Sequence, residues 1–229
     1  MRFLYFKYYC FLLCLLSLHT GLGQRFSLLA EAGIVRAQID GDKIQGFHYP
    51  GYVIGIGTHY SISIEHALSV KTSYYRHGSR AKDSFLPVSR SPFQMQMDLN
   101  SIGLEFSYKF EPKESYYFVG GGFVRHQLVQ LKYDIVSNPL YEADKEKFIL
   151  TSDQLSSSYV SFKIYYGLKL FNRADIYFAL ETGFTDLLKE ELEQLQSLNP
   201  YSLSAVFTYE IIAAKVEERK VRPGRKIRE

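Results

Sequence analysis

What this sequence lacks already excludes several classes of protein. Its 229 residues contain no tryptophan and only two cysteines, Cys10 and Cys14. Both cysteines fall within the first 23 residues, so a chain processed after residue 23 would have no disulfide bond and no cysteine chemistry. After residue 23 no uncharged apolar run approaches the roughly 18 residues of a transmembrane helix, which excludes a polytopic helical protein. The body of the chain carries no excess of positive charge, so a nucleic-acid-binding domain is not indicated.

The first 23 residues have the layout of an export signal. Arg2 and Lys7 precede an apolar stretch over 11–18, and the small residues Gly21 and Gly23 occupy the −3 and −1 positions of a cut before Gln24. This pattern predicts a secretory signal peptide over 1–23, cleaved near Gly23 and Gln24. A retained membrane anchor is the alternative, but the apolar stretch is short for that. A lipoprotein signal is excluded because a large residue precedes each cysteine.

The chain is rich in aromatic residues, 19 Tyr and 17 Phe, and from Phe26 onward its sequence alternates with a period of two. Eight stretches of about ten residues alternate apolar with small or polar side chains, beginning near residues 26, 51, 67, 101, 116, 160, 175 and 201. In the fourth, Ile102, Leu104, Phe106, Tyr108 and Phe110 alternate with Ser101, Gly103, Glu105, Ser107 and Lys109. Such alternation predicts strands whose two faces meet different environments.

The connections between these stretches also alternate. Long ones span 38–50, 77–94, 134–154 and 185–200, and short ones lie near 63–64, 111–113 and 172–173. Antiparallel pairing places all the long loops at one end, as in outer-membrane barrels. We therefore expect an all-β chain: an eight-stranded antiparallel transmembrane β-barrel over 24–214, followed by a basic periplasmic tail over 215–229.

Three local features are less regular. The fifth stretch has no clear phase, and Gly120-Gly121-Gly122 within it indicates a bulge or a close approach of neighbours. Upstream of the fourth stretch, Met95, Met97 and Leu99 suggest a phase slip, which a bulge near Asn100 would explain. Leucines at helical spacing in 186–198 predict a short amphipathic helix over the barrel mouth.

Alternation alone fits two kinds of barrel, which differ in the direction of the apolar face. A soluble periplasmic lipocalin-like barrel would point it inward and bind a ligand. A membrane barrel would point it outward. The polar face here is full of Gly, Ser and Ala, which suits a narrow eight-stranded interior, and aromatic residues lie near many strand ends, as in interfacial girdles. Both observations favour the membrane barrel.

In a membrane barrel the polar face would line the lumen with charges of both signs: Glu31, Lys71, Glu105, Lys109, Lys163, Lys169, Glu181 and Glu210. Charges desolvated in a narrow lumen are tolerable only when they are paired, so we expect a structural plug of ion pairs. A gated polar path for a small ion is the alternative, but an eight-stranded barrel barely accommodates its own side chains.

No residue pattern identifies a metal, cofactor or catalytic site. The histidines after residue 23 are His48, His59, His66, His77 and His126, none at metal-ligand spacing, and we interpret them as solvated or girdle residues. An enzyme with a site at the barrel rim would draw on His77, Ser79 and Asp83, which form no recognisable triad. We therefore expect a non-enzymatic protein without cofactor or metal, with an outer-membrane lipid-modifying enzyme as an alternative.

The chain resembles the small outer-membrane β-barrels of Gram-negative bacteria, and in particular the PorT-like barrels. The resemblance is carried by Gly23-Gln24, by Glu31-Ala32-Gly33, by the stretch 101–110 and by the glycine-rich stretch 117–122. It implies a structural, surface-contact or assembly role in the cell envelope, with the type IX secretion and gliding apparatus as the specific version. The implied partners are outer-membrane lipid and envelope or secretion-machine proteins, with no nucleic acid and with the oligomeric state left open.

Overall fold

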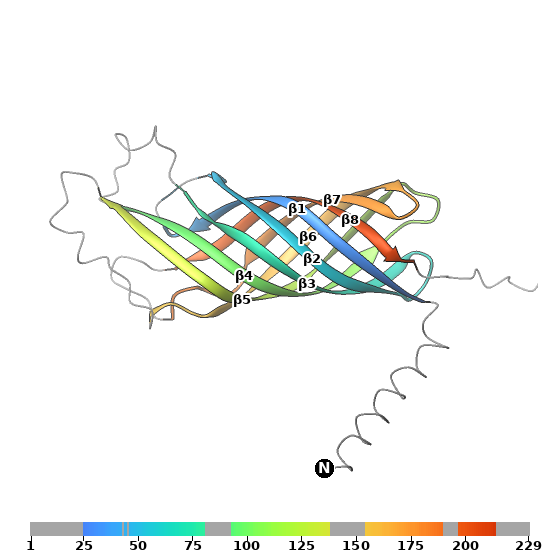
Figure 1. Ribbon diagram of the computed structural model, residues 1–229, viewed down its shortest axis with the longest axis horizontal. Helices are drawn as coiled ribbons and strands as arrows, with labels where there is room; N and C mark the ends of the chain where they lie inside the picture. The colour runs from blue at the N-terminus through green and yellow to red at the C-terminus, as the bar shows by residue number, and fades with distance from the viewer. Residues whose placement is uncertain are drawn as a thin grey trace, which may run out of the picture.

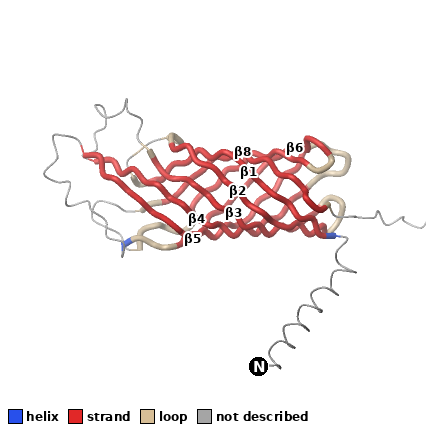
Figure 2. The backbone as a smooth tube through the Cα atoms, viewed as in Figure 1, coloured by secondary structure: helices blue, strands red, loops and turns tan. Residues whose placement is uncertain are grey.

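The computed structural model describes residues 25–42, 44, 46–80, 93–137, 154–189 and 197–213. They form eight strands: β1 (Phe26–Asp40), β2 (Tyr49–Ser61), β3 (His66–Ser79), β4 (Phe93–Phe110), β5 (Tyr117–Ser137), β6 (Ser158–Phe171), β7 (Ala174–Gly183) and β8 (Asn199–Ile212). Each strand pairs antiparallel with its neighbours in sequence, and β8 pairs with β1 to close the barrel (Figures 1 and 2). The predicted all-β, eight-stranded antiparallel barrel is confirmed. Within the described ranges, no helix has the length and apolarity to cross a membrane.

The two ends of the barrel differ as the connection lengths predicted. Connections 62–65, 111–116 and 172–173 are short and lie at the end where β1 starts and β8 finishes. In the first of them, the Ile62 and Ser63 amides both donate to the His66 carbonyl, at 2.8 and 3.1 Å, so the turn needs few residues. The strand ends joined by the other four connections lie at the opposite end, called here the loop end. The predicted signal peptide over 1–23 and tail over 215–229 lie outside the described residues.

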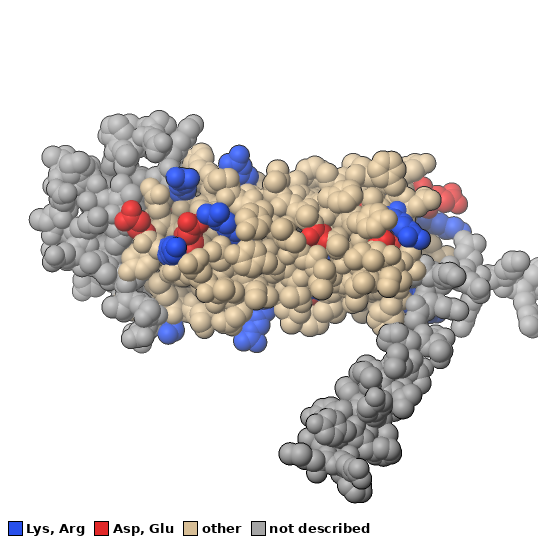
Figure 3. Space-filling view, viewed as in Figure 1, with Lys and Arg blue, Asp and Glu red and all other residues tan. Residues whose placement is uncertain are grey.

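Burial alternates along most of the barrel wall, with large apolar side chains outward and small or charged side chains inward. Ile34, Ile56 and Phe106 expose 68%, 62% and 56% of their surface, whereas Glu31 and Glu105 expose 3% and 1%. Figure 3 shows the result on one face, where charged side chains lie toward the two ends and a largely uncharged band lies between them. This distribution is the reverse of a soluble lipocalin-like barrel and excludes that alternative, because its exposed belt would face water. It is the distribution of a barrel that spans a membrane.

The prediction of a phase slip upstream of the fourth stretch is wrong, but the predicted bulge near Asn100 is present. From Met97 to Lys109 the odd-numbered residues of β4 point inward, including Met97 and Leu99 at 1% and 0% exposure. The extra residue lies on the partner strand: Asn100 pairs with Gln130 and Ser101 with Leu128, which leaves Val129 unpaired. A bulge shifts the side-chain phase of its own strand, so β5 changes phase at Val129 and β4 does not.

The same bulge explains why the fifth stretch had no clear phase. Before it, Phe118 and Val124 point inward; after it, Leu131 and Tyr133 pack toward the interior. The glycine triplet is not the bulge but a close approach. A Cβ at Gly120 would lie 2.3 Å from the Tyr165 ring, so only glycine leaves room for that inward ring.

Candidate functional site

The lumen is the candidate site because it concentrates buried charge. At its middle, Lys71 Nζ lies 3.2 Å from Glu31 Oε2 and 3.0 Å from Glu105 Oε1. Lys163 Nζ lies 2.7 Å from Glu105 Oε2. These four residues, the central charge quartet, expose only 1% to 4% of their surface. With two cations and two anions, the quartet is neutral, which is the condition for burying charge in a narrow interior.

Hydrogen bonds complete the quartet. Ser73 Oγ donates to Glu31 Oε1 at 2.6 Å, and Ser107 Oγ donates to Glu105 Oε1 at 2.7 Å. The Tyr177 hydroxyl donates to Glu31 Oε2 at 2.9 Å. Both carboxylates thus combine cation partners with neutral donors, which offsets the desolvation that burial imposes.

Toward the short-turn end a second set of charges forms around Lys109. Its Nζ lies 3.1 Å from both Asp175 Oδ2 and Glu111 Oε2, and 4.0 Å from the centre of the Phe118 ring. Lys169 also pairs with Glu111. Burial raises the pKa of Glu111 and the Lys109 ammonium lowers it, with a net pKa below the usual value.

A polar cavity of about 280 Å³ opens at this end, between the 62–65 turn and the Lys109 cluster. Its lining includes His59, His66, Glu111 and Glu210. Glu210 is half-buried there rather than part of the quartet. The structure therefore places two of the eight charges singled out in the sequence, Lys169 and Glu210, near the mouth, where they are only partly buried.

Toward the loop end the lumen holds a buried histidine cluster. His126 Nε2 lies 2.6 Å from Glu181 Oε1, and its Nδ1 lies 3.0 Å from Ser101 Oγ. His77 Nε2 lies 2.6 Å from the Tyr159 hydroxyl, and the two imidazole rings are 5.7 Å apart. The interpretation of His77 and His126 as solvated or girdle histidines is wrong, because both occupy inward positions. The uncertain phase of the fifth stretch had hidden the inward direction of His126.

Above the histidine cluster an apolar cap closes the lumen. It consists of Ile39, Met97, Leu99, Leu155, Tyr159, Leu187, Leu188 and Leu198, each 7% exposed or less. Asp186 organises part of it, since its Oδ1 accepts the Leu188 and Leu198 amides at 2.8 and 2.7 Å. Sequence analysis missed this cap. The helix expected over 186–198 falls mostly on 190–196, outside the described residues, and the described ends of that segment are not helical.

Of the three residues proposed for a rim enzyme, the two that the structure describes have different hydrogen-bond partners. His77 contacts Tyr159, and Ser79 hydrogen-bonds to the buried Asp42. Burial raises the pKa of the Asp42 carboxyl to about 7. Asp83 lies outside the described residues. Across the described ranges, no three His, Cys, Asp or Glu side chains gather as metal ligands.

Side chains fill the lumen between the charged layers. Tyr165 and Tyr177, 8% and 3% exposed, lie beside Lys71 of the quartet, and Phe118, 2% exposed, lies beside Lys109. Beside His77 and His126 a void of only about 10 Å³ remains, close to the room that one water needs. Together with the outward apolar belt, this defines the class: a transmembrane β-barrel whose lumen is packed rather than open.

Comparisons with known proteins find similarity in shape only. No protein-family model matches the chain, and no curated protein matches it. Among solved structures, Neisserial surface protein A is 14% identical, with 81% of this chain and 96% of that chain covered and a TM-score of 0.42. The Yersinia pestis outer membrane protein Ail in a phospholipid bilayer nanodisc is 11% identical, with 80% and 99% covered and a TM-score of 0.40. OprG from Pseudomonas aeruginosa is 11% identical, with 82% and 96% covered and a TM-score of 0.35.

Proposed function

We propose that this protein is a non-enzymatic outer-membrane β-barrel that serves as an anchored contact or assembly component of the envelope. The observation that carries the proposal is the packed lumen. The quartet, the histidine cluster and the apolar cap leave no pore through the described interior, and the polar cavity of about 280 Å³ is confined to the short-turn end. The parts of the chain left to contact other molecules are then the loop end, the outer wall and the basic residues 215–229.

The orientation proposed for the barrel follows from its two unequal ends. Outer-membrane barrels keep their short turns in the periplasm and their longer loops outside. With an even number of strands, both ends of the chain lie on the periplasmic side, together with residues 215–229. An export signal over 1–23, removed on the way, would deliver the chain there.

A component of a secretion apparatus is the specific version of this role. It rests on the resemblance to PorT-like barrels, whose features here are Glu31-Ala32-Gly33 and the glycine-rich start of β5. Both are used in building the barrel: Glu31 belongs to the quartet, and Gly120 makes room for Tyr165. The basic residues 215–229 would be the part of the chain that meets a periplasmic partner.

Electrical recording tests whether the barrel is an anchor or a pore. The purified protein, inserted into planar lipid bilayers, should give no sustained current steps, because its own side chains block the lumen. Insertion is verified in parallel by a shift in gel mobility between unboiled and boiled samples of the same membranes. Regular, long-lived current steps from verified barrels would contradict the proposal and support the ion-path alternative.

A further inference from the structure

The outer wall carries an apolar groove of about 590 Å³ across β6, β7, β8 and β1. Its shape follows from the strand register. Ala205 on β8 pairs with Ile34 on one side and Phe178 on the other, so a small side chain lies between two large ones. Ile34 and Phe178 expose 68% and 55% of their surface, and they form the walls of the groove above the Ala205 floor.

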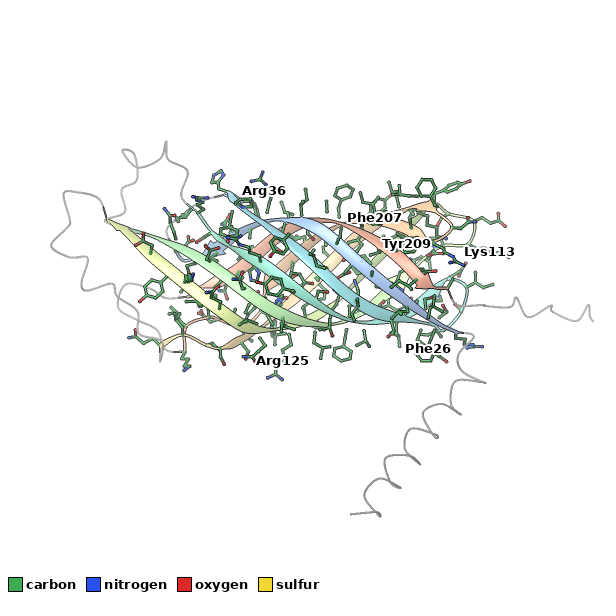
Figure 4. All side chains as sticks on the ribbon, in the orientation of Figure 1. Phe26, Arg36, Lys113, Arg125, Phe207 and Tyr209 are labelled. Carbon is green, nitrogen blue, oxygen red and sulfur yellow. The ribbon has the colours of Figure 1, made fainter. Side chains whose placement is uncertain are left out.

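A positively charged side chain, that of Arg36, lies at the loop end of this groove. Arg36 pairs with Leu203, two residues further toward the loop end than Ala205, and it lines the same groove. Figure 4 shows Arg36 projecting from the wall at about the same level along the barrel as Arg125, on the opposite side. Among the described residues, no acidic side chain forms an ion pair with Arg36.

An apolar channel that ends at an unpaired guanidinium matches the two parts of an anionic lipid. A hydrocarbon chain fits the groove, and a phosphate fits the forked donors of arginine, which bind it through two hydrogen bonds. With the short turns in the periplasm, Arg36 lies near the headgroups of the outer leaflet.

We propose that this groove is a lipid site, which seats one acyl chain of an anionic lipid whose phosphate carries the net negative charge, and holds that phosphate at Arg36. The proposal rests on the membrane orientation proposed above. A second copy of the chain is a poorer occupant, because a two-fold contact through this groove would bring the two Arg36 side chains toward each other.

The absence of tryptophan allows a direct test. Tyr166→Trp places a sole tryptophan in the groove lining, where lipids with brominated acyl chains quench its fluorescence. In phosphatidylcholine vesicles, half-maximal quenching should need about a fivefold lower mole fraction of brominated phosphatidic acid than of brominated phosphatidylcholine. A fivefold preference is the effect of one cation at the membrane surface. Arg36→Gln should abolish this preference. Lys113→Gln, in a short turn at the other end, removes the same charge and should preserve it.

A second variant tests the groove rather than the charge. Ala205→Phe fills the floor from the lipid-facing side, and it should also remove the preference while brominated lipid still quenches. Equal quenching by both lipids in the unmodified groove, or a preference that survives Arg36→Gln, would overturn the lipid site and leave the membrane orientation standing. If neither lipid quenched the tryptophan, the wall would be covered by protein or lie outside the membrane, and both proposals would fail.

Discussion

Lys163→Met should lower the free energy of unfolding by about 3–5 kcal/mol, the range for breaking a buried ion pair by removing one partner. Lys163 is 2% exposed, and its ammonium lies 2.7 Å from Glu105. Without it, the quartet holds two carboxylates and only Lys71 between them. One negative charge then remains uncompensated in a lumen closed to water. Urea unfolding of the protein in detergent micelles, followed by circular dichroism, measures the loss.

Two further variants separate charge imbalance from lost packing. Glu105→Gln combined with Lys163→Met leaves a neutral Glu31–Lys71 pair, so it should recover most of the stability. Lys169→Met removes an ammonium that is 34% exposed and pairs with Glu111, and it should cost no more than about 1 kcal/mol. If the double variant were as unstable as Lys163→Met, the quartet would not be held by charge balance.

Phe106→Lys should destabilise the folded barrel in lipid vesicles by about 2–4 kcal/mol, because it places a charge on the lipid face near mid-membrane. Phe106 is 56% exposed and pairs with Val70 and Phe123, which are also outward and apolar. Reversible urea titration in vesicles gives the difference from the unmodified protein.

The matched control for this charge is Phe106→Leu, which shortens the side chain but keeps it apolar. It should cost much less than the lysine, since both leucine and phenylalanine are compatible with lipid. Equal costs for the two variants would mean that Phe106 contacts protein rather than lipid, against the assigned direction of the β4 faces.

The sequence was sufficient for the fold because lipid and lumen demand opposite side chains. Over 101–110 every residue obeys that alternation, so strand, phase and the inward direction of Glu105 and Lys109 could all be predicted. The alternation of long and short connections then predicted antiparallel pairing of neighbouring strands, with all the long loops at one end.

The strand phase was predicted wrongly near the loop end, where both faces of a strand carry apolar residues. Near the loop end the interior itself becomes apolar, so inward Met97 and Leu99 resembled lipid-facing residues and suggested a slip that β4 does not have. The real irregularity, Val129, lies in a strand with apolar residues on both faces.

The contacts within the lumen could not be predicted either. His126 on β5 meets Glu181 on β7, two strands away. The sequence shows which residues point inward, but their pairing across the lumen depends on how far each strand is offset from strands that it does not touch.

The central claim is that the apolar face of the barrel meets lipid and the charged face meets the packed lumen. Site-directed nitroxide labels test it most directly, since both cysteines lie within residues 1–23 and single cysteines can be placed at 102 to 109 on β4. In vesicles, collision rates with oxygen should alternate with a period of two, high at 102, 104, 106 and 108 and low at 103, 105, 107 and 109. Uniform rates, or high rates at the odd positions, would contradict the account.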